Sequence, residues 1–197
     1  MKTYLRALLG LLFVASTLAS AQSSSPDALV KSTVDEVLAV MRQNKDPKTL
    51  VAAAEQKVLP HFDFARMTQF AVGRKWKEAS PEQRKSLEEG FRTLLVNTYS
   101  QAISNGVTPA DKVDVKPAQG SGEDVTVKTI VHRGGKPSVP VDYRLAKKGD
   151  GWKVYDVVVE NVSLVQTYRG SFSDEIARSG IDGLIKVLEQ KNGVKSS

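Results

Sequence analysis

The chain has 197 residues, with 28 Lys and Arg against 22 Asp and Glu, and it contains no cysteine. This length suffices for one domain with its own hydrophobic core, while the lack of cysteine excludes a disulfide framework and thiolate metal sites. The net charge of +6 is spread along the chain rather than clustered, which argues against nucleic acid as a partner.

The first 21 residues have the pattern of a secretory signal peptide. Lys2 and Arg6 give a positive start, residues 7–18 are mostly apolar, and Ala19-Ser20-Ala21 is a small-residue cleavage motif. The apolar run is too short to span a membrane, so we expect cleavage and export of residues 22–197 as one soluble domain. Loss of the two basic residues lowers the net charge from +6 to +4.

Residues 26–103 are predicted to be helical. Apolar side chains three or four positions apart indicate helices over residues 26–41, 47–58 and 64–72, and a longer helix over residues 80–103. Helices therefore precede the first strand.

Capping residues mark two of these helices. Asp63 can accept a hydrogen bond at the start of the third helix, and Gly73 can end it in a left-handed conformation. Ser80 and Gln83 have the spacing of a capping box, with Pro81 in the first helical position. The long helix is thus expected to begin at this point.

Residues 112–160 are expected to form an antiparallel meander. Apolar and polar residues alternate over residues 113–116, 124–132, 138–147 and 152–160, and glycine-containing turns separate the later segments. Pro140 lies inside the third of these strands and indicates a bulge or an edge position there.

The last strand leads directly into a helix. Val157, Val158 and Val159 are consecutive, so either face of this strand could be the buried one. At Ser163 the spacing becomes helical, and C-terminal helices are expected over residues 163–192 with a break at Gly180. The chain is therefore predicted to be an α+β protein, in which about four antiparallel strands pack against helices and bound an apolar compartment.

Residues suited to catalysis or metal binding are few. His132 fits a solvated turn residue, and His61 fits a capping or packing role at a helix entry. Asp63 or Asp142 could act as a general base in a cavity like that of ketosteroid isomerase, so an enzyme remains the alternative function. The simpler interpretation is that Asp63 is a helix cap and that Asp142 and Asp156 are outward strand positions.

Several motifs follow one another along nearly the whole mature chain. They are His61-Phe62-Asp63-Phe64 with Met67-Thr68, Gly73-Arg74-x-Trp76, Ala79-Ser80-Pro81-x-Gln83-Arg84, Phe91-x-x-Leu94-Leu95-x-x-x-Tyr99, Trp152-Lys153-Val154-Tyr155-Asp156-Val157, Glu160-x-Val162-Ser163-Leu164-Val165 and Gly180-Ile181-Asp182-Gly183-Leu184. In this order and spacing they resemble the MlaC, or toluene-tolerance, family of periplasmic phospholipid carriers.

The resemblance implies a nuclear-transport-factor-like fold with an apolar lipid cleft between the sheet and the helices. It also implies a monomeric periplasmic carrier, not an enzyme, that holds phospholipid as cargo and uses no metal or other cofactor. The implied partners are the MlaA–porin complex of the outer membrane and the MlaD ring of an inner-membrane ABC transporter. Such a carrier would maintain the lipid asymmetry of the outer membrane.

The lipid-contact residues are expected among large apolar side chains of the sheet and the surrounding helices. The same side chains also fit an ordinary packed core, because periodicity does not distinguish a filled apolar face from an unfilled one. The candidates are Phe64, Met67, Phe70, Phe91, Leu94, Leu95, Val127, Val141, Tyr143, Trp152, Val154, Val162, Val165 and Tyr168.

Overall fold

A computed structural model describes residues 24–43, 46–106, 112–149 and 151–193. The expected signal peptide, residues 1–21, lies outside the described residues. Within these ranges, no helix is both long and apolar enough to cross a membrane. The elements in chain order are α1 (Pro26–Gln43), α2 (Pro47–Lys57), η1 (Leu59–His61), α3 (Phe64–Val72), η2 (Gly73–Lys77), α4 (Pro81–Gly106), β1 (Lys112–Val115), β2 (Gln119–Ser121), β3 (Asp124–Arg133), β4 (Lys136–Lys148), β5 (Gly151–Val159), β6 (Val162–Ser163) and α5 (Leu164–Lys191).

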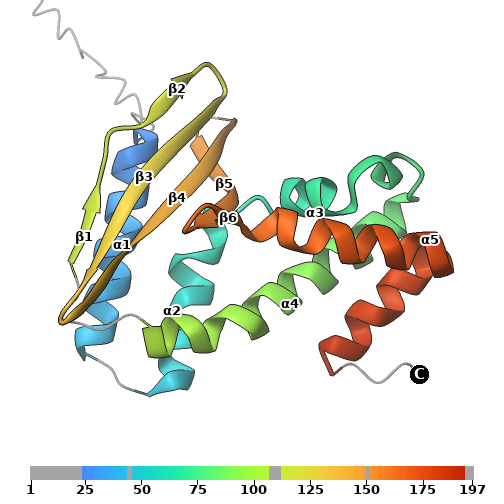
Figure 1. Ribbon diagram of the computed structural model, residues 1–197, viewed down its shortest axis with the longest axis horizontal. Coiled ribbons are helices and arrows are strands. Elements are labelled where there is room, and N and C mark those ends of the chain that lie inside the picture. Colours follow the sequence, from blue (N-terminus) through green and yellow to red (C-terminus); the bar gives the residue numbers. More distant parts are fainter. Residues whose placement is uncertain (1–23, 44–45, 107–111, 150, 194–197) are drawn as a thin grey trace, which may run out of the picture.

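The described strands form one antiparallel sheet in the order β1-β3-β4-β5-β6, with β2 also paired to β3. The α+β prediction is confirmed, and the four expected strands correspond to β1, β3, β4 and β5. The short strands β2 and β6 were not predicted, because three and two residues are too few to show alternation. Figure 1 shows α1 lying across one face of the sheet, while α3, α4 and α5 form a separate helical layer beside it.

The strand register decides which face of β5 is turned inward. Tyr143 of β4 pairs with Val157, but Leu145 pairs with Val154, so a bulge at Tyr155 shifts the alternation by one residue. Residues on the two sides of the bulge therefore reach the same face of the sheet. We call this the inner face, and it carries Val125, Val127, Thr129, Val141, Tyr143, Leu145, Trp152, Val154, Val157 and Val159.

The opposite side, which we call the outer face, is mostly polar. It carries Thr126 and Lys128 from β3, Asp142 and Arg144 from β4, and Val158 from β5. A sheet with one apolar and one polar face is the arrangement expected of antiparallel strands covered by helices on one side.

The helical layer has its own core. Met67 of α3, Leu87 and Phe91 of α4, and Leu184 of α5 have almost no exposed surface and belong to one cluster. The predicted break in α5 is confirmed at Gly180, where φ is 72°. This break lets the second half of α5 turn back along α4.

The predicted caps are confirmed in the same layer. The Arg66 amide donates to Asp63 Oδ1 over 3.1 Å at the start of α3, and Gly73 ends this helix with φ of 69°. The Gln83 amide donates to Ser80 Oγ over 3.2 Å, and the Ser80 amide donates to Gln83 Oε1 over 3.0 Å. These reciprocal bonds satisfy amides that the helix itself leaves without partners.

The bulge expected at Pro140 is absent, but the alternative of an edge position holds locally, because the pairing of β4 with β5 ends at Val141 and Val159. β4 lies between β3 and β5, and Pro140 pairs in regular register with Ile130. The Pro140 carbonyl accepts from the Glu160 amide, one residue beyond the end of β5. In an antiparallel strand the nitrogen and the carbonyl of one residue point to the same neighbouring strand. The Pro140 nitrogen therefore points toward the chain beyond the end of β5, where the sheet loses no hydrogen bond for lack of an N–H donor.

Asp156 joins the sheet to the helical layer. Its side chain lies on the outer face but is only 3% exposed, because the start of α5 covers it. Oδ2 accepts from Ser163 Oγ over 2.7 Å and from Arg144 Nη1 over 3.2 Å, and Oδ1 accepts from the Val165 amide over 3.3 Å. Asp156 therefore lies on the outward face, as expected, but it is buried there.

We predict that Asp156→Ala lowers the free energy of unfolding by about 3 kcal/mol. The variant leaves the Val165 amide and Ser163 hydroxyl without their acceptor and removes the partner of Arg144. Urea unfolding followed by circular dichroism measures the loss. Asp142→Ala on the same face is the matched control and should change stability by no more than about 0.5 kcal/mol. Equal losses in both variants would contradict the role given to Asp156.

Candidate functional site

Twelve of the fourteen candidate residues belong to two separate hydrophobic clusters, and the other two, Phe70 and Val162, lie at the surface. Phe62, which was not a candidate, packs against both clusters. The helical cluster contains Phe64, Met67, Phe91, Leu94, Leu95, Val165 and Tyr168. The sheet cluster contains Val127, Val141, Tyr143, Trp152 and Val154.

Phe70 and Val162 lie outside both clusters and are 38% and 59% exposed. The Phe70 ring stacks on Tyr155 with the centroids 5.6 Å apart. The Arg66 guanidinium lies 4.0 Å from the centre of the Tyr155 ring, and Arg66 Nη2 is 2.7 Å from Asp124 Oδ1. Phe70 therefore belongs to a surface aromatic group held by a cation, and it does not face the inner side of the sheet.

The inner face is buried unevenly along its strands. Val127 and Leu145 are fully buried, whereas Val141, Tyr143 and Val159 on the same face are only partly buried. All five side chains belong to or pack against the sheet cluster. Part of the apolar surface of β4 and β5 therefore remains accessible to solvent, although other side chains of the same cluster are fully buried.

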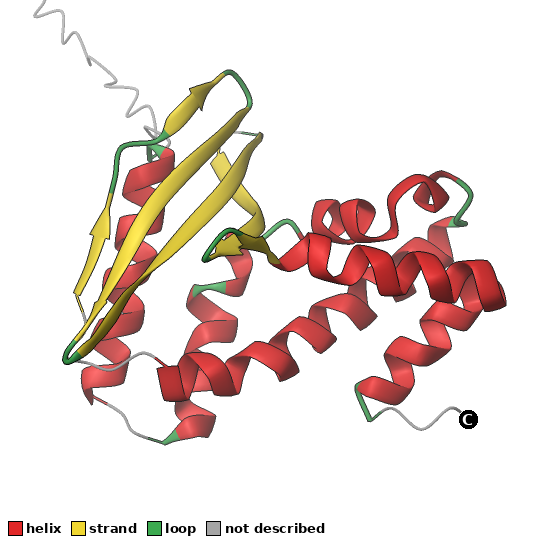
Figure 2. Cartoon of the chain, in the orientation of Figure 1, coloured by secondary structure: helices red, strands yellow, loops and turns green. Residues whose placement is uncertain are grey.

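The helices near this face also carry half-buried apolar residues. Leu29 and Val34 of α1 pack against the sheet cluster. Leu50 and Val51 of α2 are likewise partly buried, and this helix, which lies beside α1 in Figure 2, contacts both α1 and α4. Their helical periodicity marks all four in the sequence, but only the structure shows that they keep accessible surface.

Tyr143 is the inner-face residue with the most unusual environment. Burial raises the pKa of its phenol to about 12. The side chain nevertheless keeps accessible surface, and its hydroxyl makes no hydrogen bond with a described residue. The hydroxyl is thus surrounded by protein but not satisfied by it.

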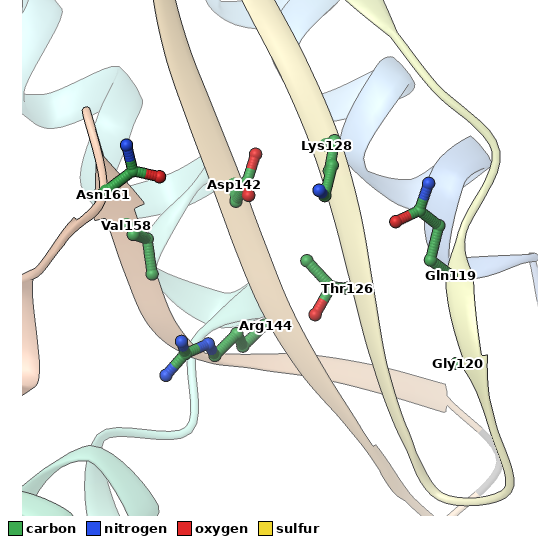
Figure 3. Close-up of a pocket in the computed structure, with 8 residues that line it drawn as sticks. All are labelled: Gln119, Gly120, Thr126, Lys128, Asp142, Arg144, Val158 and Asn161. Atoms are coloured by element: carbon green, nitrogen blue, oxygen red, sulfur yellow. The ribbon is translucent and has the colours of Figure 1, made fainter.

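Two polar hollows lie on the outer side of the sheet. The larger, of about 390 Å³, is lined mainly by polar side chains that include Gln119, Thr126, Lys128, Asp142 and Arg144, as Figure 3 shows. The second, of about 130 Å³, lies where Arg144 and Asp156 meet Phe70 and Gln166. Neither hollow is the apolar compartment expected from the sequence, because both open on the polar face.

The alternative of a general base in an apolar cavity finds no support at the two aspartates considered for it. Asp63 Oδ2 is 2.8 Å from Lys148 Nζ, and its other oxygen caps α3. Asp142 lines the polar hollow together with Lys128 and Arg144. Both carboxylates thus have cationic neighbours in polar surroundings.

The two histidines have structural contacts. His132 is the penultimate residue of β3 rather than part of the turn, but it lies at the hairpin end and its side chain is 43% exposed, as expected of a solvated residue. Its Nε2 is 2.9 Å from Asp114 Oδ2. Hydrogen bonding by His132 and Lys112 lowers the pKa of Asp114.

His61 lies in η1, and its pKa is lowered mainly by burial and to a smaller extent by the nearby positive charge of Lys153. Among the described residues, no group of three or more acidic or histidine side chains could hold a metal ion.

Glu88 of α4 lies close enough to Asp63, the cap of α3, and to Lys148 for both charges to affect its pKa. Burial raises the pKa of Glu88, and the negative charge of Asp63 raises it further. Lys148, which pairs with Asp63, acts in the opposite direction. The ionised Glu88 carboxylate is therefore less favourable in the folded chain than in the unfolded chain.

Comparison with known proteins gives consistent matches over most of the chain. The family model described as MlaC protein matches residues 31–190. Toluene tolerance protein Ttg2D of Pseudomonas putida is 27% identical over 189 residues, covering 92% of this chain and 87% of the relative. The intermembrane phospholipid transport system binding protein MlaC of Haemophilus influenzae is 24% identical over 175 residues, covering 85% of this chain and 82% of the relative.

A solved structure has the same fold. It is the phospholipid-binding protein from Ralstonia solanacearum, determined in complex with a phospholipid. The TM-score is 0.78 with 36% sequence identity, and the match covers 86% of this chain and 98% of the other.

We predict that Glu88→Gln raises the free energy of unfolding at pH 7 by less than about 1 kcal/mol, because the site is partly solvated. A raised folded-state pKa means that the charge opposes folding only when the carboxyl is ionised. The difference between variant and parent should therefore vanish as the pH falls below the ordinary value of 4.5. Urea unfolding at several pH values measures it, with Glu55→Gln on an exposed part of α2 as the control. A stabilisation that persists at low pH would contradict this origin.

Proposed function

This chain belongs to the MlaC family, and we propose on that basis that it is a periplasmic carrier that binds phospholipid without covalent chemistry. The Haemophilus relative is named as a binding protein of an intermembrane phospholipid transport system, and the Ralstonia structure contains a phospholipid. After cleavage of residues 1–21, residues 22–197 would form one lipid-binding domain in the periplasm. The observation that carries the proposal is the match to the family over residues 31–190.

The energetics of lipid in water explain why a carrier is needed. Each methylene exposed to water costs ~0.8 kcal/mol, so two acyl chains with about thirty methylenes cost roughly 20 kcal/mol. Free movement of phospholipid through an aqueous compartment is therefore negligible. A carrier has to replace most of this burial with its own apolar surface.

We place the acyl chains against the inner face of the sheet. Val141, Tyr143 and Val159 keep accessible apolar surface there, and Leu29 and Val34 of α1 lie opposite in the same cluster. Trp152 is also partly buried and extends this surface along β5, while the buried Val154 lies beneath it in the same cluster. The candidates of the helical cluster, such as the fully buried Phe91, would support the wall from behind rather than touch the lipid.

We further propose the partners that the family assignment suggests. Lipid would be exchanged with an MlaA–porin complex at the outer membrane and with the MlaD ring of an inner-membrane ABC transporter. Support comes from the name of the Haemophilus relative, which places that protein in an intermembrane transport system. Transfer of labelled phospholipid between vesicles bearing the two complexes should require this protein, and transfer at the same rate without it would refute the assignment.

The proposed function is tested by extracting the purified mature protein with organic solvent and analysing the extract by mass spectrometry. We expect phospholipid in a fixed ratio to protein, or uptake from vesicles by protein that has been delipidated. A folded protein that neither holds phospholipid after purification nor takes it from vesicles would refute the proposal.

We predict that Val141→Phe reduces the bound phospholipid several-fold. The larger side chain would fill accessible space on the inner face, because Val141 is only partly buried there. The ratio of extracted lipid to protein measures the effect, and circular dichroism verifies the fold.

The matched control for this change is Ile130→Phe. Ile130 lies one position from Thr129, the partner of Val141, and so points to the outer face. This variant should bind as much lipid as the parent. Equal lipid content in the two variants would contradict the assignment of the inner face.

A further inference from the structure

The inner face of the sheet carries a tyrosine side chain, Tyr143, whose placement on that face is fixed by the strand register. Tyr143 pairs with Val127 on one side and Val157 on the other, in the middle of the sheet. Thr129, on the same face, donates its hydroxyl hydrogen to the Val141 carbonyl over 2.7 Å and is thereby satisfied. The Tyr143 hydroxyl forms no hydrogen bond with any residue that the structure describes.

This hydroxyl is not sealed inside the core. Among the described residues, the buried polar side-chain atom left without a partner is Asn192 Oδ1, and the Tyr143 oxygen is not such an atom. Tyr143 keeps accessible surface, although the surrounding protein desolvates the phenol strongly enough to raise its pKa to about 12. The hydroxyl therefore faces accessible space within protein, where a small molecule could reach it.

The surroundings of Tyr143 favour a neutral hydrogen-bond acceptor. Its inner-face neighbours are Val127, Val141, Leu145 and Val157, and none of them carries charge. A phosphate group would lose its hydration here without gaining a cation, whereas an ester carbonyl needs only one donor. In a phospholipid, ester carbonyls lie between the acyl chains and the polar head group.

We propose that the Tyr143 hydroxyl donates a hydrogen bond to an ester carbonyl of the bound phospholipid and thereby sets the depth of the acyl chains. This inference rests on the proposed function, because it requires the lipid to lie against the inner face. It makes Tyr143 a specificity-determining residue that distinguishes acyl esters from lipids without the carbonyl. A diether phospholipid offers the same head group and chains but lacks this acceptor.

The test compares diester and diether lipids in competition. Delipidated protein is incubated with vesicles that contain equal amounts of diester and diether phosphatidylglycerol with matched chains, and the lipids extracted from the protein are quantified by mass spectrometry. We expect the parent protein to favour the diester about 2- to 10-fold, which corresponds to one net hydrogen bond. Tyr143→Phe keeps the ring and should bring the ratio close to one.

The matched control is Tyr155→Phe. Tyr155 lies at the bulge of the neighbouring strand and stacks on Phe70 at the surface, so loss of its hydroxyl should leave the diester preference unchanged. A parent protein without preference, or a Tyr143→Phe variant that keeps it, would overturn the inference while leaving the carrier function intact. If no protein takes up either lipid, the proposed function itself fails. The ratio is measured within each sample, so a change in total loading does not affect the comparison.

Discussion

The arrangement of the molecule depends on how β5 is joined to α5. The sheet and the helical layer have separate hydrophobic clusters, so their relative position rests on a small number of contacts at the junction. Asp156 supplies two of them, because its carboxylate accepts hydrogen bonds from the Ser163 hydroxyl and the Val165 amide, while Arg144 on the neighbouring strand β4 pairs with the same carboxylate. The Asp63 amide adds a bond of 2.8 Å to the Val154 carbonyl, which fixes the start of α3 against the same strand. A buried carboxylate is costly unless it is fully paired, and here the pairing also fixes the direction in which α5 leaves the sheet.

This construction leaves the inner face of the sheet partly uncovered. α1 packs over β1 and β3, near one edge of the sheet, while α3 and α5 contact β5, near the other edge. The helices therefore cover the sheet less completely in its middle, around β4. The burial pattern follows, because Val127 and Leu145 are closed off while Val141 and Val159 keep accessible surface. A domain optimised only for stability would fill this region, since buried apolar area contributes about 25 cal/mol per Å². An incompletely covered apolar face between separately packed layers is the feature that a lipid carrier of the proposed kind requires.

Local sequence signals predicted most of the elements, because caps and periodicity act over a few residues. Ser80 with Gln83, Asp63 and Gly180 each marked a helix boundary that the structure confirms. The inward face of β5 could not be predicted, because the bulge at Tyr155 depends on pairing with β4. The burial of Asp156 was missed for a similar reason, since the groups that cover it belong to a helix that begins several residues later. Composition likewise showed the candidate apolar residues but not their division into a helical cluster and a sheet cluster, which depends on packing between distant segments.

A carrier must bind its cargo strongly enough to keep it from water and weakly enough to give it up. Full burial of two acyl chains would recover roughly 20 kcal/mol, and a site that returned all of this would not release the lipid on a useful timescale. An apolar face lined by Val141 and Val159 can bury acyl chains but cannot fix their position. Hydrophobic and dispersion contacts change little when an acyl chain slides along such a face. In the proposed complex, the Tyr143 hydroxyl would fix the depth of the lipid while adding only about one hydrogen bond to the binding free energy. In such a site the position of the lipid and the strength of its binding are set by different residues. For a passive carrier, the direction of net transport follows from the partners that load and unload it.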